Sequence, residues 1–189
     1  MKSYIVIDSA VLVATLDNND VYHFDAVWLL LELIARKDYI QILVPPLVMY
    51  EVIVTLRRKG VSPEVIQTRL MKFVHLPYVS IVALSEMSAF KHAAHSLNKG
   101  DKSKTLRASD FVIFSVGYEF DGYIVTFDKA MHKKCKSVYD HIYYCSDVGN
   151  KADETANILV TLDNAAGENV TDPNYWPAKA HPRPTTQAS

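Results

Sequence analysis

YIVIDSAVL, residues 4–12, is the stretch that decides the fold of this 189-residue chain. Residues 4–7 form a short, β-branched apolar run, which predicts a strand buried on both faces. Asp8 ends this run, and Ser9 is a suitable N-cap for a helix over the next apolar residues. The stretch therefore predicts a buried strand that ends in an acid and leads directly into a helix.

The same alternation of apolar runs and amphipathic stretches recurs along the chain. Further strands are predicted at residues 41–44, 78–84, 123–127 and 138–145. Helices are predicted at about residues 23–36, 46–60, 62–73, 85–100, 109–118 and 152–162, with a basic turn or short helix at 129–136. Strands that alternate with helices indicate an α/β fold with a central, mainly parallel sheet covered on both faces.

The composition changes near the end of this pattern. We expect one domain over residues 1–148 and a C-terminal extension over 149–189, with one helix and then an irregular tail from about Ala165, where Asn, Pro, Thr, Ala and Gly dominate. The net charge is −1, so nucleic acid would have to be held by local basic patches.

Nothing in the sequence predicts export or membrane insertion. The first apolar run is too short for a signal peptide, and no apolar window approaches the length of a bilayer span. We therefore expect a cytoplasmic protein with no membrane partner. Cys135 and Cys145 are predicted to be buried, idle thiols, and His92 and His95 to be structural because a zinc site would need more ligands.

Four acids far apart in the sequence are predicted to meet at the carboxyl edge of the sheet, where such sheets bind ligands. Asp8 and Asp128 each follow a strand, Glu51 lies early in a helix after the second strand, and Asp110 lies in the first turn of a helix that leads to the fourth. Each acid has an ordinary alternative, because Asp after a strand is a common helix cap and Glu51 could be a surface residue. However, Glu51 interrupts an apolar stretch, where an unused charge is unfavourable.

Carboxylates that converge in this way repel one another unless a cation lies between them. Mg²⁺ or Mn²⁺ prefers such oxygen ligands. Two ions ~4 Å apart could hold both oxygens of a phosphodiester that is cleaved, and one ion could still activate water and polarise the phosphate. Both arrangements remain open.

Four segments in order resemble the PIN-domain nucleases, in particular the VapC-like toxin ribonucleases of toxin–antitoxin systems. They are residues 5–12 with Asp8, 45–51 with Glu51, 108–113 with Asp110, and 124–131 with Asp128. The resemblance covers roughly residues 3–146. It implies a three-layer α/β/α sandwich, metal-dependent cleavage of RNA, frequent homodimers and, for a toxin, an antitoxin partner.

The resemblance also implies roles for single residues. Asp8, Glu51, Asp110 and Asp128 would bind Mg²⁺ or Mn²⁺ directly or through water, and Glu51 or Asp110 would orient the attacking water. The hydroxyls of Ser9 and Thr126 would hold these carboxylates, although a helix cap and a strand residue are equally good interpretations.

Basic residues on both sides of the acids are candidates for RNA phosphate contacts or for a solvated surface. The candidates are Lys102, Lys104, Arg107, Lys129 and Lys133. Arg57, Arg58 and Lys59 are assigned instead to the C-terminal dipole of their helix. The carboxylates of Asp17, Asp20 and Asp25 are assigned to turns and helix starts, with Asp17 a possible neighbour of the site.

Two other functions are weighed. A phosphatase of the haloacid dehalogenase type would need a second acid two positions after Asp8, where this chain has Ala10. A non-catalytic PIN-fold module that binds RNA or protein is the main alternative, but retention of all four acids favours catalysis. The toxin role would be strengthened by an upstream gene for a DNA-binding antitoxin.

Overall fold

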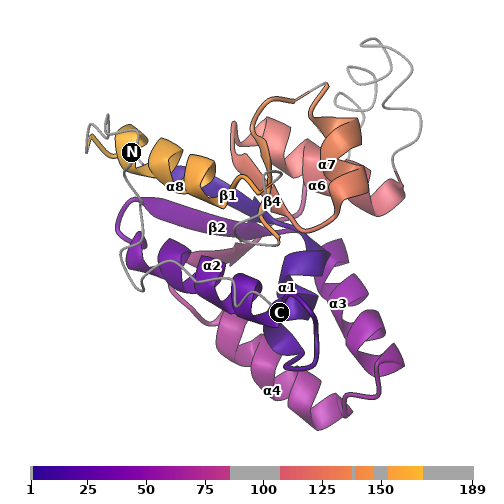
Figure 1. Cartoon of the computed structure of the whole chain (residues 1–189). Coiled ribbons are helices and arrows are strands. Elements are labelled where there is room, and N and C mark those ends of the chain that lie inside the picture. The colour runs from indigo at the N-terminus through magenta and orange to yellow at the C-terminus, as the bar shows by residue number, and fades with distance from the viewer. Residues whose placement is uncertain (1, 86–106, 138, 147–152, 168–189) are drawn as a thin grey trace, which may run out of the picture.

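Five parallel strands form the centre of the molecule (Figure 1). The computed structural model describes residues 2–85, 107–137, 139–146 and 153–167. The elements in chain order are β1 (Ser3–Ile7), α1 (Ser9–Leu16), α2 (His23–Ala35), β2 (Ile40–Val44), α3 (Pro46–Arg58), α4 (Pro63–Val74), β3 (Val79–Ile81), α6 (Ala108–Glu119), β4 (Tyr123–Thr126), α7 (Lys129–Cys135), β5 (Ile142–Tyr144) and α8 (Thr155–Ala165).

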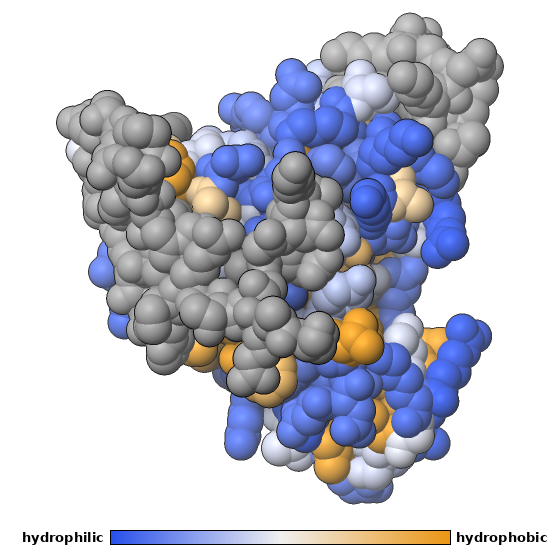
Figure 2. Space-filling view, in the orientation of Figure 1, coloured by the Kyte–Doolittle hydropathy of each residue, from blue (hydrophilic) through white to orange (hydrophobic). Residues whose placement is uncertain are grey.

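The strand order β3-β2-β1-β4-β5 determines how the helices cover the sheet. Connections from β1 to β2 and from β2 to β3 run in one direction along the sheet, whereas the connections to β4 and β5 run in the other. Because such crossovers are right-handed, the two directions place their helices on opposite faces. Helix α6 packs on β1 and β4, while α2 contacts α1 and α8. The described residues on the face drawn in Figure 2 are mainly hydrophilic. The predicted three-layer α/β/α sandwich is confirmed.

The central strands are buried because both of their faces are covered. Ile5, Val6 and Ile7 of β1 and Ile124 and Val125 of β4 are fully buried, which explains why these strands consist of consecutive apolar residues. The edge strands β3 and β5 pair on one side only and are shorter than the predicted stretches 78–84 and 138–145.

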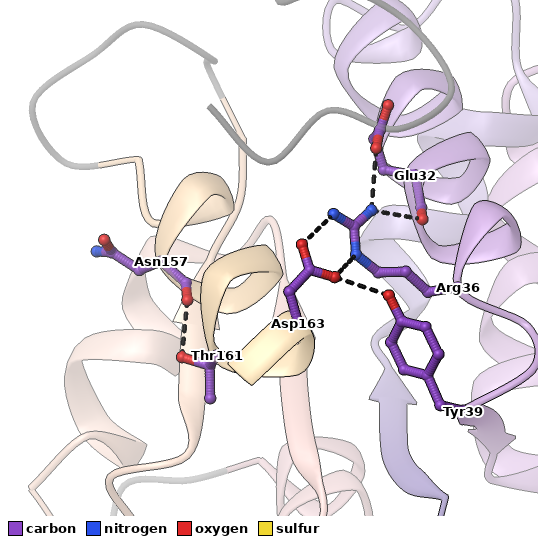
Figure 3. Close-up of polar contacts among 6 residues, drawn as sticks. All are labelled: Glu32, Arg36, Tyr39, Asn157, Thr161 and Asp163. Carbon is purple, nitrogen blue, oxygen red and sulfur yellow. Dashed lines mark hydrogen bonds and ion pairs between the residues drawn. The ribbon is translucent and has the colours of Figure 1, made fainter. Parts of the chain in front are cut away.

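The helix of the C-terminal extension is part of this packing. Asp163 on α8 accepts hydrogen bonds from Nε and Nη2 of Arg36, both at 2.8 Å, and from the hydroxyl of Tyr39 at 2.7 Å (Figure 3). Arg36 also donates to the side chain of Glu32 at 3.0 Å. Arg36, Glu32 and Asp163 are fully buried, so this ionic cluster fixes α8 to the end of α2.

Several predictions concern other parts of the chain. The helix expected at 85–100, with His92 and His95, and nearly all of the expected tail lie outside the described residues. Cys135 and Cys145 are buried and free, as predicted. Among the described residues, no helix combines the length and hydrophobicity that a membrane-spanning segment needs.

Candidate active site

The ends of the two central strands carry two of the four predicted acids. Asp8 follows β1 directly, and Asp128 lies two residues after the end of β4. These strands are neighbours, and the backbone N–H of Asp8 donates to the carbonyl of Val125 at 3.1 Å. The order of the connections reverses between β1 and β4, and such a reversal is where ligands bind in parallel sheets.

All four acids line one open cleft of about 730 Å³. Asp8, Glu51, Asp110 and Asp128 line it from the end of β1, from α3, from the first turn of α6 and from the start of α7, respectively. In Figure 2 the molecule is hollowed between the surface over α6 and α7 and the surface over α3. The structure therefore brings the four predicted acids to one place.

Asp8 is held by side chains rather than used as a helix cap. It occupies the N-cap position of α1, where the sequence predicted Ser9, but its side chain forms no N-capping hydrogen bond. Instead, the hydroxyl of Thr126 donates to Oδ2 at 2.6 Å, and that of Ser9 to Oδ1 at 3.2 Å. Asp8 is only 5% exposed, and Thr126 is fully buried. The helix-cap interpretation therefore holds for the position of Asp8 but not for its side chain, and the prediction that Ser9 is the N-cap is wrong, because Ser9 is the first residue of α1.

Asp128 has a capping role at one of its oxygens. Its Oδ1 accepts hydrogen bonds from the backbone N–H groups of Ala130 and Met131, at 2.7 and 3.0 Å, at the start of α7. Its own N–H donates to the Thr126 hydroxyl at 2.9 Å. Thr126 thus connects the backbone of one acid to the carboxylate of the other.

The remaining two acids are less constrained. Oδ2 of Asp110 accepts a 3.3 Å hydrogen bond from the backbone N–H of Arg107. Glu51 is half-buried on α3 and forms no hydrogen bond or ion pair with the residues that the structure describes. The side chains of Asp110 and Glu51 can therefore turn toward a ligand with little loss of hydrogen bonds.

Burial and mutual repulsion shift the protonation of the acids. Burial raises the pKa of Asp8 to about 6, despite the hydrogen bonds from Thr126 and Ser9, and the charge of Asp110 adds to this shift. Burial also raises the pKa of Asp110, to which the charge of Asp128 contributes. The ionised forms are therefore destabilised in the protein without a cation.

The cleft and its surroundings do not suit catalysis by a cysteine nucleophile or a histidine base. Burial raises the pKa of Cys135 to about 12, and the charges of Asp110 and Asp8 add to this shift, so the residue is not a thiolate nucleophile. Among the described residues that line the cleft, none is a histidine. Carboxylates are thus the groups that can accept a proton or bind a cation here.

The acids line one cleft but are not yet arranged around a single metal-binding point. Within the described ranges, no group of three or more His, Cys, Asp or Glu side chains already lies at metal-binding distances. However, the donors in the cleft are all oxygens, which suit a hard divalent cation, and none of the four acids forms an ion pair within the described part of the chain. The residues therefore fit such a cation, provided that some side chains move toward it.

The predicted phosphate-binding residues have different locations. Arg107 lines the cleft. Lys129 and Lys133 are exposed on α7 but do not line it, and Lys102 and Lys104 lie outside the described residues. Their contacts with RNA stay a prediction.

The assignment of the basic end of α3 to the helix dipole holds for the positions of Arg57 and Arg58 in the last turn, but it misses a second environment. Arg58 and Lys59 line the cleft, and Lys59 forms ion pairs with Asp17 at 2.9 Å and with Asp20 at 2.6 Å. Asp17 and Asp20 also cap backbone N–H groups in their turn, as expected. The missed signal is helical spacing: Arg58 is seven positions, or two turns, after Glu51 and therefore shares its face.

Aromatic residues of the cleft were not predicted as site residues either. Tyr50 on α3 and the pair of Tyr22 and Phe127 line it, and the rings of this pair meet edge to face with centroids 5.9 Å apart. No local sequence pattern distinguishes them from core aromatics.

Two solved structures resemble this fold. VapC20 of Mycobacterium tuberculosis, described as a sarcin–ricin-loop-cleaving toxin, superposes with a TM-score of 0.53 at 16% identity, over 68% of this chain and 93% of that one. A chain of VapBC2 from Rickettsia felis, solved with a DNA fragment from its promoter, gives 0.55 at 18% identity, over 76% and 99%. No curated protein sequence matches the chain significantly.

A sequence model of the PIN domain matches residues 5–137. This range begins in β1, ends after α7 and contains the four acids of the cleft. Because the match covers most of the chain and agrees with the observed topology, the protein belongs to the PIN domain family.

Proposed function

We propose that this protein is a divalent-metal-dependent endoribonuclease that hydrolyses RNA phosphodiester bonds in the cleft of the four carboxylates. The observation that carries the proposal is the convergence of Asp8, Glu51, Asp110 and Asp128 on one cleft from four separate elements. Membership of the PIN family and the description of VapC20 as a sarcin–ricin-loop-cleaving toxin support it.

Mg²⁺ or Mn²⁺ is the cofactor that the donors favour. Asp8 would be the central ligand, because it is buried and its two oxygens are positioned by hydroxyls. Asp110, the free oxygen of Asp128, and Glu51 would complete the set, directly or through water. When bound, the cation supplies charge stabilisation to the phosphate and lowers the pKa of a bound water.

The residues of the chain have separable tasks around that cation. Thr126 and Ser9 orient the Asp8 carboxylate, so that its lone pairs point to a fixed place. Glu51 or Asp110, which have few hydrogen bonds of their own, can orient the attacking water and accept its proton. Arg107 on the cleft wall offers a cation to a neighbouring phosphate.

A toxin role with an antitoxin partner is a finer part of the proposal. Both similar structures are toxins or toxin–antitoxin components by description, and one is a complex. We infer that the chain forms a homodimer and is inhibited by a protein partner. The role is tested by co-expression: the chain alone should slow growth, and the product of a neighbouring small gene should restore it.

A non-catalytic PIN-fold module is the second candidate. The absence of a preformed metal cluster among the described residues is the observation that favours it. Such a module would bind RNA or protein with no dependence on the four acids.

Hydrolysis assays separate these candidates. Purified protein should cleave single-stranded RNA with Mg²⁺ or Mn²⁺, should lose activity with a chelator, and should lose it with Asp8→Asn or Asp110→Asn. The matched control is Asp140→Asn, which removes an exposed carboxylate outside the cleft. Cleavage by Asp8→Asn at the wild-type rate, or cleavage without metal, would overturn the proposal.

A further inference from the structure

One face of α3 forms a wall of the cleft. Residues from this helix that line the cleft recur every three or four positions, so they share one side of the helix: Leu47, Tyr50, Glu51, Val54, Thr55 and Arg58. Val48, Val52 and Leu56 occupy the buried side. The proposed hydrolysis accounts for Glu51 but for no other residue of this cleft face.

Tyr50 is the most unusual member of the cleft face. Its side chain is 67% exposed, and it forms no hydrogen bond or ring contact with the described residues. Val54, one turn further along, is 47% exposed. A single exposed apolar residue is ordinary. An unsupported aromatic ring that immediately precedes a proposed metal ligand and lines the same cleft has the position of a ligand contact.

The outer side of α3 has a different environment. Met49, Ile53 and Arg57 line a separate, mostly apolar groove with α4. Tyr50 is not part of this groove, and Ile53 is not part of the cleft. The helix therefore offers an internal comparison, because exposed apolar residues on its two sides can be changed independently.

The same cleft face ends in an available positive charge. Arg58 is exposed and forms no ion pair or hydrogen bond within the described part of the chain. Its neighbour Lys59 is bound to Asp17 and Asp20. Eight residues of helix place Arg58 ~12 Å along the axis from Tyr50, and Arg107 supplies a second cation from the α6 side of the cleft.

An exposed ring flanked by cations in an open groove is the combination that binds single-stranded nucleic acid. A base stacks on the ring for about 1–3 kcal/mol, without sequence preference, while arginine holds the backbone. Only an unpaired base has a free face for such a contact, because the bases of a duplex stack on one another. The free cation of Arg58 favours this ligand over an apolar peptide.

We propose that Tyr50 is the platform of a nucleobase subsite beside the scissile phosphate and that Arg58 holds a phosphate of the same strand. This inference rests on the proposed nuclease function and adds two residues that bind the RNA. It assigns a binding task to Tyr50 and Arg58, which the metal site does not require.

Binding is measured separately from cleavage to test the subsite. Two probes are compared: a short, fluorescein-labelled single-stranded RNA of mixed sequence, and the same strand annealed to its complement. The protein is full-length Asp8→Asn, which prevents hydrolysis of the probe. Fluorescence anisotropy should show that Tyr50→Ala weakens single-strand binding about tenfold, while Tyr50→Phe and Tyr50→Trp retain it. Ile53→Ala is the matched control on the other side of the helix and should bind as the parent.

The phosphate contact of Arg58 is tested through the salt dependence of RNA binding. Arg58→Gln should reduce the slope of log affinity against log salt concentration by about 0.7, the value for one phosphate contact with a single strand. Arg57→Gln, which changes the neighbouring residue on the α4 groove, should leave the slope unchanged. An unchanged slope in Arg58→Gln would overturn the phosphate contact.

Other results of these experiments would overturn the base subsite or separate it from the nuclease function. Unchanged single-strand binding in Tyr50→Ala, loss of binding in Tyr50→Phe, or tighter binding of the duplex would overturn the base subsite. Dissociation of a dimer by Tyr50→Ala with RNA binding intact, measured by analytical ultracentrifugation, would assign the cleft face to a protein interface and also overturn it. If Tyr50-dependent binding persists but wild-type protein never cleaves RNA, the subsite is supported and the nuclease function fails.

Discussion

The hydroxyl of Thr126, at the end of β4, donates a 2.6 Å hydrogen bond to the carboxylate of Asp8, at the end of β1. The same hydroxyl oxygen accepts the backbone N–H of Asp128 at 2.9 Å. One fully buried side chain therefore sets the relative position of two acids that follow neighbouring strands.

Replacement of Thr126 should affect metal binding more than folding. Thr126→Val keeps the shape but removes the hydroxyl, so we expect a loss of about 10- to 100-fold in Mn²⁺ affinity or cleavage rate. Thr126→Ser retains the hydroxyl and should retain most activity. Isothermal titration with Mn²⁺ and a cleavage assay check this. Equal affinity in the Val and Ser variants would show that the hydrogen bond has no positioning role.

Removal of the Asp8 charge should stabilise the metal-free protein. The pKa of Asp8 is raised from 3.8 to about 6 in the fold, so its ionised form favours the unfolded state above pH ~6. At 1.36 kcal/mol per pKa unit, Asp8→Asn should gain up to about 3 kcal/mol at neutral pH. The gain should decrease as pH falls below 6 and vanish below about 4, where Asp8 is protonated in both states.

Denaturant unfolding in the presence of chelator measures this gain. Asp140→Asn, an exposed control, should show no comparable change. Destabilisation of the metal-free protein by Asp8→Asn at neutral pH would contradict the expected direction.

Metal affinity should depend on pH through the carboxylates of Asp8 and Asp110. A cation binds the ionised carboxylates, and the pKa values of Asp8 and Asp110 are both raised. The apparent Mn²⁺ affinity should therefore be constant well above pH ~6 and fall at least about tenfold per pH unit below it. Titrations on either side of this value check the dependence, and a flat profile would argue against Asp8 as a ligand.

The ionic cluster at α8 should control stability without controlling the cleft. Asp163→Ala leaves the buried guanidinium of Arg36 without its carboxylate, so we expect a loss of about 3–5 kcal/mol in the free energy of unfolding (Figure 3). Thr161→Ala, at a half-buried position of the same helix where the hydroxyl donates only to the carbonyl of Asn157, should change it far less.

Mn²⁺ affinity separates this structural role from a role in the site. Asp163 does not line the cleft, so the affinity of folded Asp163→Ala should equal that of the wild type. A variant that is fully stable would show that α8 is held by its apolar contacts alone.

Local sequence patterns predicted the central strands and the positions of the four acids. Apolar runs that stop at an acid mark the strand ends before Asp8 and Asp128, and parallel topology then places these acids at one edge of the sheet. The strand β4 ends at Thr126, one residue earlier than predicted. The capping of α7 by Asp128 was also open to prediction. The family resemblance implied that the hydroxyls of Ser9 and Thr126 hold the carboxylates, and both of them donate to Asp8 once β1 pairs with β4.

Contacts between distant segments were beyond such patterns. Arg36 and Asp163 are separated by 127 positions, and nothing local distinguishes either from a surface charge. The error at Arg58 had another cause: weight was given to the end of the helix, where a dipole favours cations, rather than to the face that it shares with Glu51. The exposure of Tyr50 likewise depends on how α3 packs.

Anomalous diffraction from a crystal soaked with Mn²⁺ tests the central claim most directly. We expect a peak in the cleft at about 2.0–2.2 Å from an oxygen of Asp8, the usual range for small divalent cations, with oxygens of at least one of Asp110, Asp128 and Glu51 coordinating directly or through water. The same soak of Asp8→Asn crystals should show no such peak. A fully soaked wild-type crystal with no manganese in the cleft, or with manganese bound only elsewhere, would contradict the account.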